Sequence, residues 1–143
     1  MKGSCLCGAI SFVCEFPTKW CCHCHCSLCR KSHGSAFVTW FGVASEQFKF
    51  LSGDTPEELG VYHSTPDATR KFCKTCGSHL IFESQRWPGE IHLTVASLLG
   101  PLDRNPKIHV FCSDAAEWLD LPSLHTLPRH GGASGLELLP QSQ

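Results

Sequence analysis

Short runs in which hydrophobic and polar residues alternate predict strands along most of the chain. In residues 9–14, Ile10, Phe12 and Cys14 would share one face of a half-buried strand. Runs rich in β-branched and aromatic residues predict further strands at residues 36–41, 80–82, 91–95 and 108–111. Glycine and proline separate these runs, as is typical of turns. The pattern therefore predicts a mainly β fold.

Helical patterns are scarce and short. One helix is expected at Ser27–Ser32 and another at Asp114–Trp118. The last residues are rich in glycine, serine, proline and glutamine, a composition typical of flexible tails. We therefore expect a single domain at residues 1–128, followed by a flexible tail at residues 129–143.

The bulk composition narrows the classes of function. The chain has 143 residues, of which 42% are hydrophobic and 17% charged, as in a globular domain. Its net charge of −1 and the lack of a basic run argue against nucleic-acid binding. No apolar stretch approaches a membrane span, and Met1-Lys2-Gly3-Ser4 begins no apolar signal region. A cytoplasmic location, away from membranes, is expected.

Cysteines are the most informative residues in this composition. The chain has 11 of them, and most fall into tight clusters. The clusters are Cys5-Leu6-Cys7, Cys24-His25-Cys26-Ser27-Leu28-Cys29 and Cys73-Lys74-Thr75-Cys76. In a reducing compartment such clusters favour metal sites over disulfides. A redox role for a Cys-x-x-Cys pair is disfavoured, because the strand and long helix of a thioredoxin context are missing.

Two of the clusters together offer four thiolates. Cys5 and Cys7 would point to one side of an extended segment. Cys73 and Cys76 are spaced for a tight turn, which Gly77 would let the backbone leave. Four sulfurs make a closed, structural zinc site. One zinc joining the pairs would pin the N-terminus to the middle of the chain.

The third cluster offers three thiolates, so the number of protein ligands at a metal bound there is not determined. Cys24 and Cys26 would point the same way, and Cys29 would lie near a helix start, where thiolates are favoured. Arg30 and Lys31 add positive charge that would suit a substrate carboxylate. A fourth ligand would close the site, and the nearby candidates are Cys21, Cys22, His23, His25 and His33. The spacing leaves open and closed forms equally possible.

Together these motifs resemble the glutathione-dependent formaldehyde-activating family, which includes the centromere protein V branch. The resemblance rests on three motifs and a late histidine over about residues 3 to 130. They are Gly3-Ser4-Cys5-Leu6-Cys7-Gly8, Cys24-His25-Cys26-Ser27-Leu28-Cys29-Arg30-Lys31 with Gly34, Phe72-Cys73-Lys74-Thr75-Cys76-Gly77-Ser78 with Leu80, and His109 with Trp118-Leu119. The chain departs from the family pattern at His79, Phe111, Cys21 and Cys22.

The resemblance implies a β-tent fold of antiparallel sheets braced by zinc, with one or two short helices. It implies that Cys5, Cys7, Cys73 and Cys76 hold a structural zinc, and that Cys24, Cys26 and Cys29 hold a second, catalytic zinc. The activity it implies is that of a carbon–sulfur lyase, read in reverse as condensation of formaldehyde with glutathione to S-hydroxymethylglutathione. In such a reaction a substrate thiol would ionise at the open zinc position. His25, His33 and His109 are the candidates for the acid or base, and His109 is the one that matches the family.

Two other functions stay open at this point. In the first alternative, the chain would serve as a non-catalytic, zinc-braced module that presents a surface to a protein partner. Alternatively, it would buffer metal or redox equivalents through the unassigned thiols, Cys14, Cys21, Cys22 and Cys112. Such a buffer needs exposed thiols of low pKa, whereas an enzyme needs an open second site. Nothing in the sequence indicates the oligomeric state.

Overall fold

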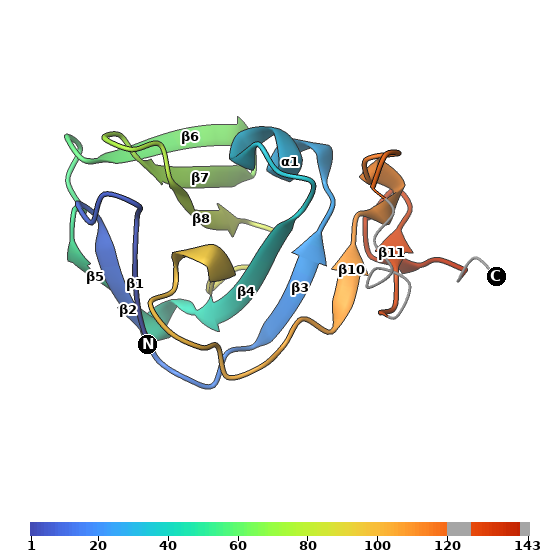
Figure 1. The fold of residues 1–143 in the computed structure, drawn as a ribbon, viewed down its shortest axis with the longest axis horizontal. Coiled ribbons are helices and arrows are strands. Elements are labelled where there is room, and N and C mark those ends of the chain that lie inside the picture. Colours follow the sequence, from blue (N-terminus) through green and yellow to red (C-terminus); the bar gives the residue numbers. More distant parts are fainter. Residues whose placement is uncertain (120–126, 141–143) are drawn as a thin grey trace. The chain divides into compact units, whose positions relative to one another are not determined.

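The computed structural model describes residues 1–119 and 127–140 and confirms the mainly β fold with short helices (Figure 1). The strands are β1 Lys2–Ser4, β2 Ser11–Cys14, β3 Trp20–Cys24, β4 Val38–Ala44, β5 Phe48–Ser52, β6 Leu59–Thr65, β7 Ala68–Cys73, β8 His79–Ser84, β9 Glu90–Thr94, β10 Ile108–Val110, β11 His130–Gly131 and β12 Glu137–Leu138. The helices are α1 Ser27–His33 and the 3-10 turns η1 Ser45–Gln47, η2 Val95–Ser97 and η3 Cys112–Asp114.

The chain divides into two compact units. Unit one comprises residues 1–20 and 41–104, and unit two comprises residues 21–40 and 105–143. The predicted boundary between a domain at 1–128 and a tail at 129–143 stays a prediction. Part of that predicted tail forms the strand pair β11–β12, in which His130 pairs with Leu138.

Unit one is built from antiparallel strand pairs. β1, β2 and β5 form a three-stranded sheet in which Gly3 pairs with Phe12 and Phe12 with Phe50. A second sheet has the order β4-β9-β8-β7-β6. The alternation predicted for residues 9–14 is confirmed, since Ile10, Phe12 and Cys14 are all 0% exposed. These side chains anchor the core next to the loop that carries the first two cysteines.

A buried polar cluster in unit one surrounds the side chain of His92. Glu90 and His92 lie two residues apart on β9, so their side chains leave the same face. The indole of Trp20 donates to Glu90 Oε2 at 3.1 Å, and His92 Nε2 lies 3.3 Å from the same oxygen. Lys19 makes an ion pair with Glu90. Burial lowers the pKa of His92 to about 4, although Glu90 acts to raise it.

This cluster predicts a pH dependence of stability. His92 is neutral in the folded chain down to about pH 4, whereas an unfolded histidine takes up its proton near pH 6.5. Its contribution to stability is therefore complete above pH 6.5 and is lost as the pH falls toward 4, by up to about 1.4 kcal/mol per pH unit. We expect His92→Gln to flatten this part of the profile, measured by urea unfolding at pH 7, 6 and 5. His63→Gln, at an exposed histidine of unit one, is the control and should follow the wild type. A His92→Gln profile parallel to the wild type would contradict the assignment.

Unit two contains the second cysteine cluster. β10 runs parallel to β3, with His109 opposite His23 and Val110 opposite Cys24, and β3 lies next to β4. The helix predicted at Ser27–Ser32 is confirmed as α1. Gly34 caps its C-terminus and has a left-handed backbone conformation with φ 59°. The prediction of a helix at Asp114–Trp118 is wrong. The chain instead forms the 3-10 turn Cys112–Asp114, and Ala115 already has an extended backbone.

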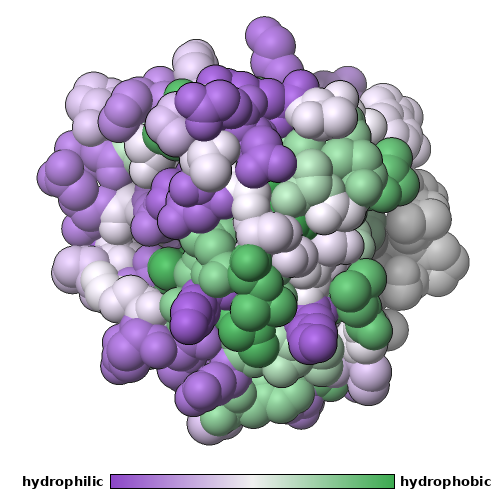
Figure 2. Space-filling model, turned by 90° about the vertical axis from the view of Figure 1, so that its left-hand side faces the viewer, coloured by the Kyte–Doolittle hydropathy of each residue, from purple (hydrophilic) through white to green (hydrophobic). Residues whose placement is uncertain are grey.

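Among the helices of the described residues, none is long and apolar enough to cross a membrane. Figure 2 shows a face on which hydrophobic side chains gather among hydrophilic ones. Leu6, Leu51 and Leu99 are among the exposed hydrophobic residues of unit one.

Candidate functional site

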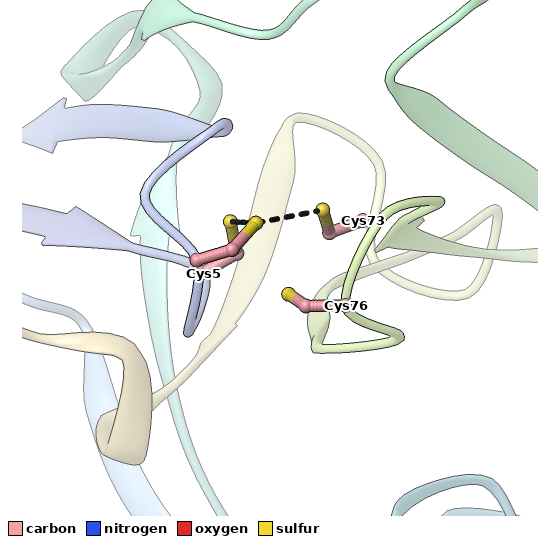
Figure 3. A group of neighbouring side chains, drawn as sticks. Cys5, Cys73 and Cys76 are labelled. Carbon is pink, nitrogen blue, oxygen red and sulfur yellow. Dashed lines mark hydrogen bonds between the residues drawn. The ribbon is translucent and has the colours of Figure 1, made fainter.

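Four cysteine sulfurs from two loops of unit one converge on one point (Figure 3). Cys5 and Cys7 follow β1, whereas Cys73 ends β7 and Cys76 lies in the turn before β8. The four sulfur atoms all lie within 4.8 Å of one another. The structure therefore brings together the four residues that the resemblance assigns to a structural metal site.

Both cysteine pairs lie in turns of the backbone, and only one of these turns was predicted. The extended conformation expected for Cys5 and Cys7 is wrong, because the chain turns there and the Gly8 amide donates to the Cys5 carbonyl at 3.1 Å. The turn expected after Cys73 is confirmed, since the Gly77 amide donates to the Cys73 carbonyl at 2.9 Å. Gly77 leaves the turn with φ 74°, a backbone conformation that favours glycine.

The spacing of the sulfurs fits a tetrahedral thiophilic cation. Cys7 Sγ lies 3.5 Å from Cys5 Sγ and 3.7 Å from Cys73 Sγ. Zinc–sulfur bonds of about 2.3 Å in a tetrahedron place the sulfurs about 3.8 Å apart. The Ile10 amide also donates to Cys5 Sγ at 3.3 Å, which helps to fix the position of this sulfur. An ion bound here would have a sulfur at each of its four coordination positions, which is the arrangement of a closed, structural site.

Cys7 and Cys76 differ in acidity. Hydrogen bonds from the Ser78 hydroxyl and amide lower the pKa of Cys76 to about 5. A backbone hydrogen bond from Ala9 lowers the pKa of Cys7, but hydrogen bonding with Cys5 and partial desolvation outweigh it and raise the value to about 12. The Ser78 hydroxyl also accepts from the Leu6 amide at 3.1 Å. Ser78 therefore links the two cysteine loops and favours the Cys76 thiolate.

The second cysteine cluster lies at the junction of β3 and α1 in unit two. Cys24 ends β3, Cys26 caps the N-terminus of α1, and Cys29 lies in its first turn. Cys24 and Cys29 are buried, and Cys26 is half-buried. A hydrogen bond with Cys29, followed by burial, raises the pKa of the Cys26 thiol. Within residues 1–119 and 127–140, however, these three sulfurs do not form a second group as compact as the first.

A metal at this second cluster therefore stays a prediction. Cys26 and Cys29 already interact, so binding would require Cys24 to join them. Of the two predicted carboxylate-binding residues, Lys31 is exposed and Arg30 uses its Nε to donate to the His25 carbonyl at 3.2 Å. Their predicted roles are also untested.

His25, which lies between Cys24 and Cys26 in the sequence, forms a buried pair with His109. His25 Nε2 lies 2.9 Å from His109 Nδ1, and the two residues are 2% and 1% exposed. His23 stacks on the His109 ring with centroids 4.9 Å apart, and its Nδ1 lies 2.9 Å from the Thr39 hydroxyl. Burial is the largest cause that lowers the pKa values of His25 and His109 to about 4, and neighbouring charges add to it. Both rings are therefore neutral near pH 7.

The histidine pair leaves two nitrogens at its ends. His25 Nδ1 and His109 Nε2 are buried and have no hydrogen-bond partner among the described residues. In a bonded pair of neutral imidazoles, one of these ends carries a proton and the other a lone pair. The pair can thus accept a proton at one end and release one at the other. Sequence reasoning named His25 and His109 as separate candidates and missed their pairing.

These features define the class of protein. The chain is a mainly β, cysteine-rich protein with a four-sulfur cluster that could hold a metal ion and a second cysteine cluster beside a buried histidine pair. Residues 1–114 match the family "glutathione-dependent formaldehyde-activating enzyme", and the chain belongs to this family. The predictions of the family and of a lyase-like enzyme are thereby confirmed.

Individual relatives agree with this assignment. The chain is 29% identical over 137 residues to a Halomonas elongata protein whose name places it in the same family, with 86% of this chain and 82% of that protein covered. It is 37% identical over 83 residues to an uncharacterized lyase of Schizosaccharomyces pombe, with 57% and 56% covered. A crystal structure of a Rhodobacter sphaeroides protein matches with a TM-score of 0.60 and 29% identity, over 73% of this chain and 93% of that one.

Proposed function

We propose that the chain catalyses the making or breaking of a carbon–sulfur bond in a small thiol–aldehyde adduct, with glutathione and formaldehyde as the first candidates. The observation that carries the proposal is the second cysteine cluster, in which His25, between Cys24 and Cys26, belongs to a buried histidine pair. Family membership supports the reaction type. In the synthetic direction the thiol sulfur bonds to the aldehyde carbon, the carbonyl π bond breaks, and one proton moves from sulfur to oxygen.

Zinc is the proposed metal at both cysteine clusters. Cys5, Cys7, Cys73 and Cys76 would hold the structural ion, and Cys24, Cys26 and Cys29 would hold the catalytic ion. A zinc ion with three protein ligands keeps a fourth position for a substrate thiol and lowers the pKa of that thiol. The chain's own groups must then manage the proton that the thiol releases.

The histidine pair suits this proton transfer. His109 is buried and bonded to His25, so in the proposed mechanism it exchanges protons with the site through His25. In the tautomer with a lone pair on His25 Nδ1, His25 would take up the proton that the thiol releases and return it to the oxygen of the new hydroxymethyl group. Burial disfavours the charged imidazolium and therefore favours this return. His109, the predicted acid or base, thus acts as part of a pair.

The alternative functions have less support. Cys14, Cys21 and Cys22 are 0%, 3% and 7% exposed, so these thiols are poorly placed to buffer metals or oxidants in solution. A non-catalytic binding module would need neither an open second site nor a buried histidine pair. With a net charge of −1, the chain has no general attraction for nucleic acid. A cytoplasmic location would keep its thiols reduced.

The test combines turnover with spectroscopy. Purified, zinc-loaded protein should consume formaldehyde in the presence of glutathione faster than the uncatalysed reaction. In cobalt-substituted protein, the visible d–d spectrum should show two thiolate-rich sites, and glutathione should shift one of them. If formaldehyde is consumed at the uncatalysed rate and the cobalt spectrum ignores glutathione, this pair of substrates is wrong.

A further inference from the structure

Arg129 is a half-buried cation without a carboxylate partner among the described residues. Its Nη2 donates to the Pro140 carbonyl at 3.4 Å, which is a weak hydrogen bond. Its Nε is buried and has no partner within residues 1–119 and 127–140. Ion pairs of the described residues do not include this arginine. Because a charged group that is partly removed from water is normally paired, the guanidinium is available to an anionic ligand.

His109 presents a second donor position beside Arg129. The two residues are partners in a parallel bridge, and the His109 amide donates to the Pro128 carbonyl at 2.9 Å. Side chains of bridge partners leave the same face of their strands, so the imidazole and the guanidinium are neighbours. The charge of Arg129 also lowers the pKa of His109. His109 Nδ1 is engaged with His25, so Nε2 is the nitrogen left to bind a ligand.

We propose that His109 and Arg129 bind a carboxylate of the acidic thiol substrate. This inference rests on the proposed function, because it names how the same site recognises its thiol. Arg129 would supply a charged N–H donor and His109 Nε2 a neutral one, and both would reach the oxygens of one carboxylate. Charge-assisted hydrogen bonds of this kind are about twice as strong as neutral ones. Arg129 lies beyond residues 1–114, so the family match does not include it.

Carboxylate binding would also set the tautomer of the histidine pair. An anion accepts hydrogen bonds, so it selects the form in which His109 Nε2 carries its proton. His109 Nδ1 then has the lone pair and accepts from His25 Nε2, across the 2.9 Å contact. His25 Nδ1 is left with a lone pair, in the residue between Cys24 and Cys26. A bound carboxylate would thus prepare a proton acceptor beside the second cysteine cluster.

The test uses the zinc-loaded full chain and ¹⁵N NMR of its histidine rings. The probe is S-methylglutathione, which keeps both carboxylates but has no ionisable thiol. We expect saturable changes that move His109 Nε2 toward a protonated and His25 Nδ1 toward an unprotonated shift. The probe with both carboxylates esterified should bind at least tenfold more weakly. Arg129→Gln should remove the difference between acid and ester.

Controls separate this inference from the proposed function. Arg86→Gln removes an exposed arginine of unit one and should bind the acid as the wild type does. The inference is overturned if acid and ester bind equally to the wild type, if neither perturbs the His109 ring, or if Arg129→Gln still discriminates between them. The comparison of acid and ester needs no variant, so a folding defect of Arg129→Gln does not obscure it. Absence of turnover with glutathione, together with normal binding of S-methylglutathione, would refute only the proposed reaction.

Discussion

Replacing Cys73 by serine is expected to abolish metal binding at the four-sulfur site and to unfold unit one at 37 °C. Cys73 is 0% exposed, and its sulfur contacts that of Cys7, which lies 66 residues earlier in the sequence. Structural zinc contributes about 10–16 kcal/mol in small zinc-finger peptides, which equals or exceeds the whole stability of a typical domain. The variant also leaves a hydroxyl in a buried position. The measurements are metal content per chain by native mass spectrometry and thermal melting by circular dichroism.

A matched control is available in the same unit. Cys14 is equally buried at 0% exposed but lies outside both cysteine clusters. Cys14→Ala removes one sulfur atom from the core and should cost only about 1–2 kcal/mol, with metal content unchanged. Chelation of the wild-type metal should reproduce the Cys73→Ser melt. If Cys73→Ser kept both its metal and its melting temperature, the four-sulfur cluster would not be the structural site.

The four-sulfur site shows what the sequence can predict. Spacings of two and three residues were sufficient to define the two cysteine pairs, and the family resemblance assigned both pairs to one ion. The same spacings did not determine the backbone, since a turn and an extended segment can both place Cys5 and Cys7 around one ion. The structure selects the turn, which Gly8 stabilises through its hydrogen bond to the Cys5 carbonyl.

The histidine pair shows where prediction from the sequence ends. His25 and His109 are 84 residues apart, and their contact depends on the parallel register of β3 and β10. Alternation can predict each strand separately, but it contains no information on which strands pair or in which register. Arg129 was assigned to a flexible tail because of its glycine-rich surroundings, and its bridge to His109 comes only from the structure. Long-range pairing therefore determines the part of the candidate site that local patterns miss.

Replacing Cys26 by serine is expected to separate catalysis from folding. The four-sulfur cluster of unit one does not include Cys26, so the variant should melt like the wild type and keep its structural metal. Its turnover should fall by at least about 100-fold, the upper end of the cost of losing even an outer-shell partner of a metal. In the cobalt-substituted variant the response to glutathione should disappear, since Cys26 and its hydrogen-bonded neighbour Cys29 belong to the proposed open site.

The matched control for Cys26→Ser is Cys112→Ser. Cys112 is also a half-buried thiol of unit two, and it belongs to neither cysteine cluster. It should keep both metal ions, the cobalt response and full turnover. Full activity of both variants, together with an unchanged cobalt response to glutathione, would refute the second zinc site. Loss of activity in Cys26→Ser with an unchanged cobalt spectrum would instead show that Cys26 is essential for turnover but does not bind the metal. The spectrum, rather than the rate, therefore decides whether this cluster binds the metal.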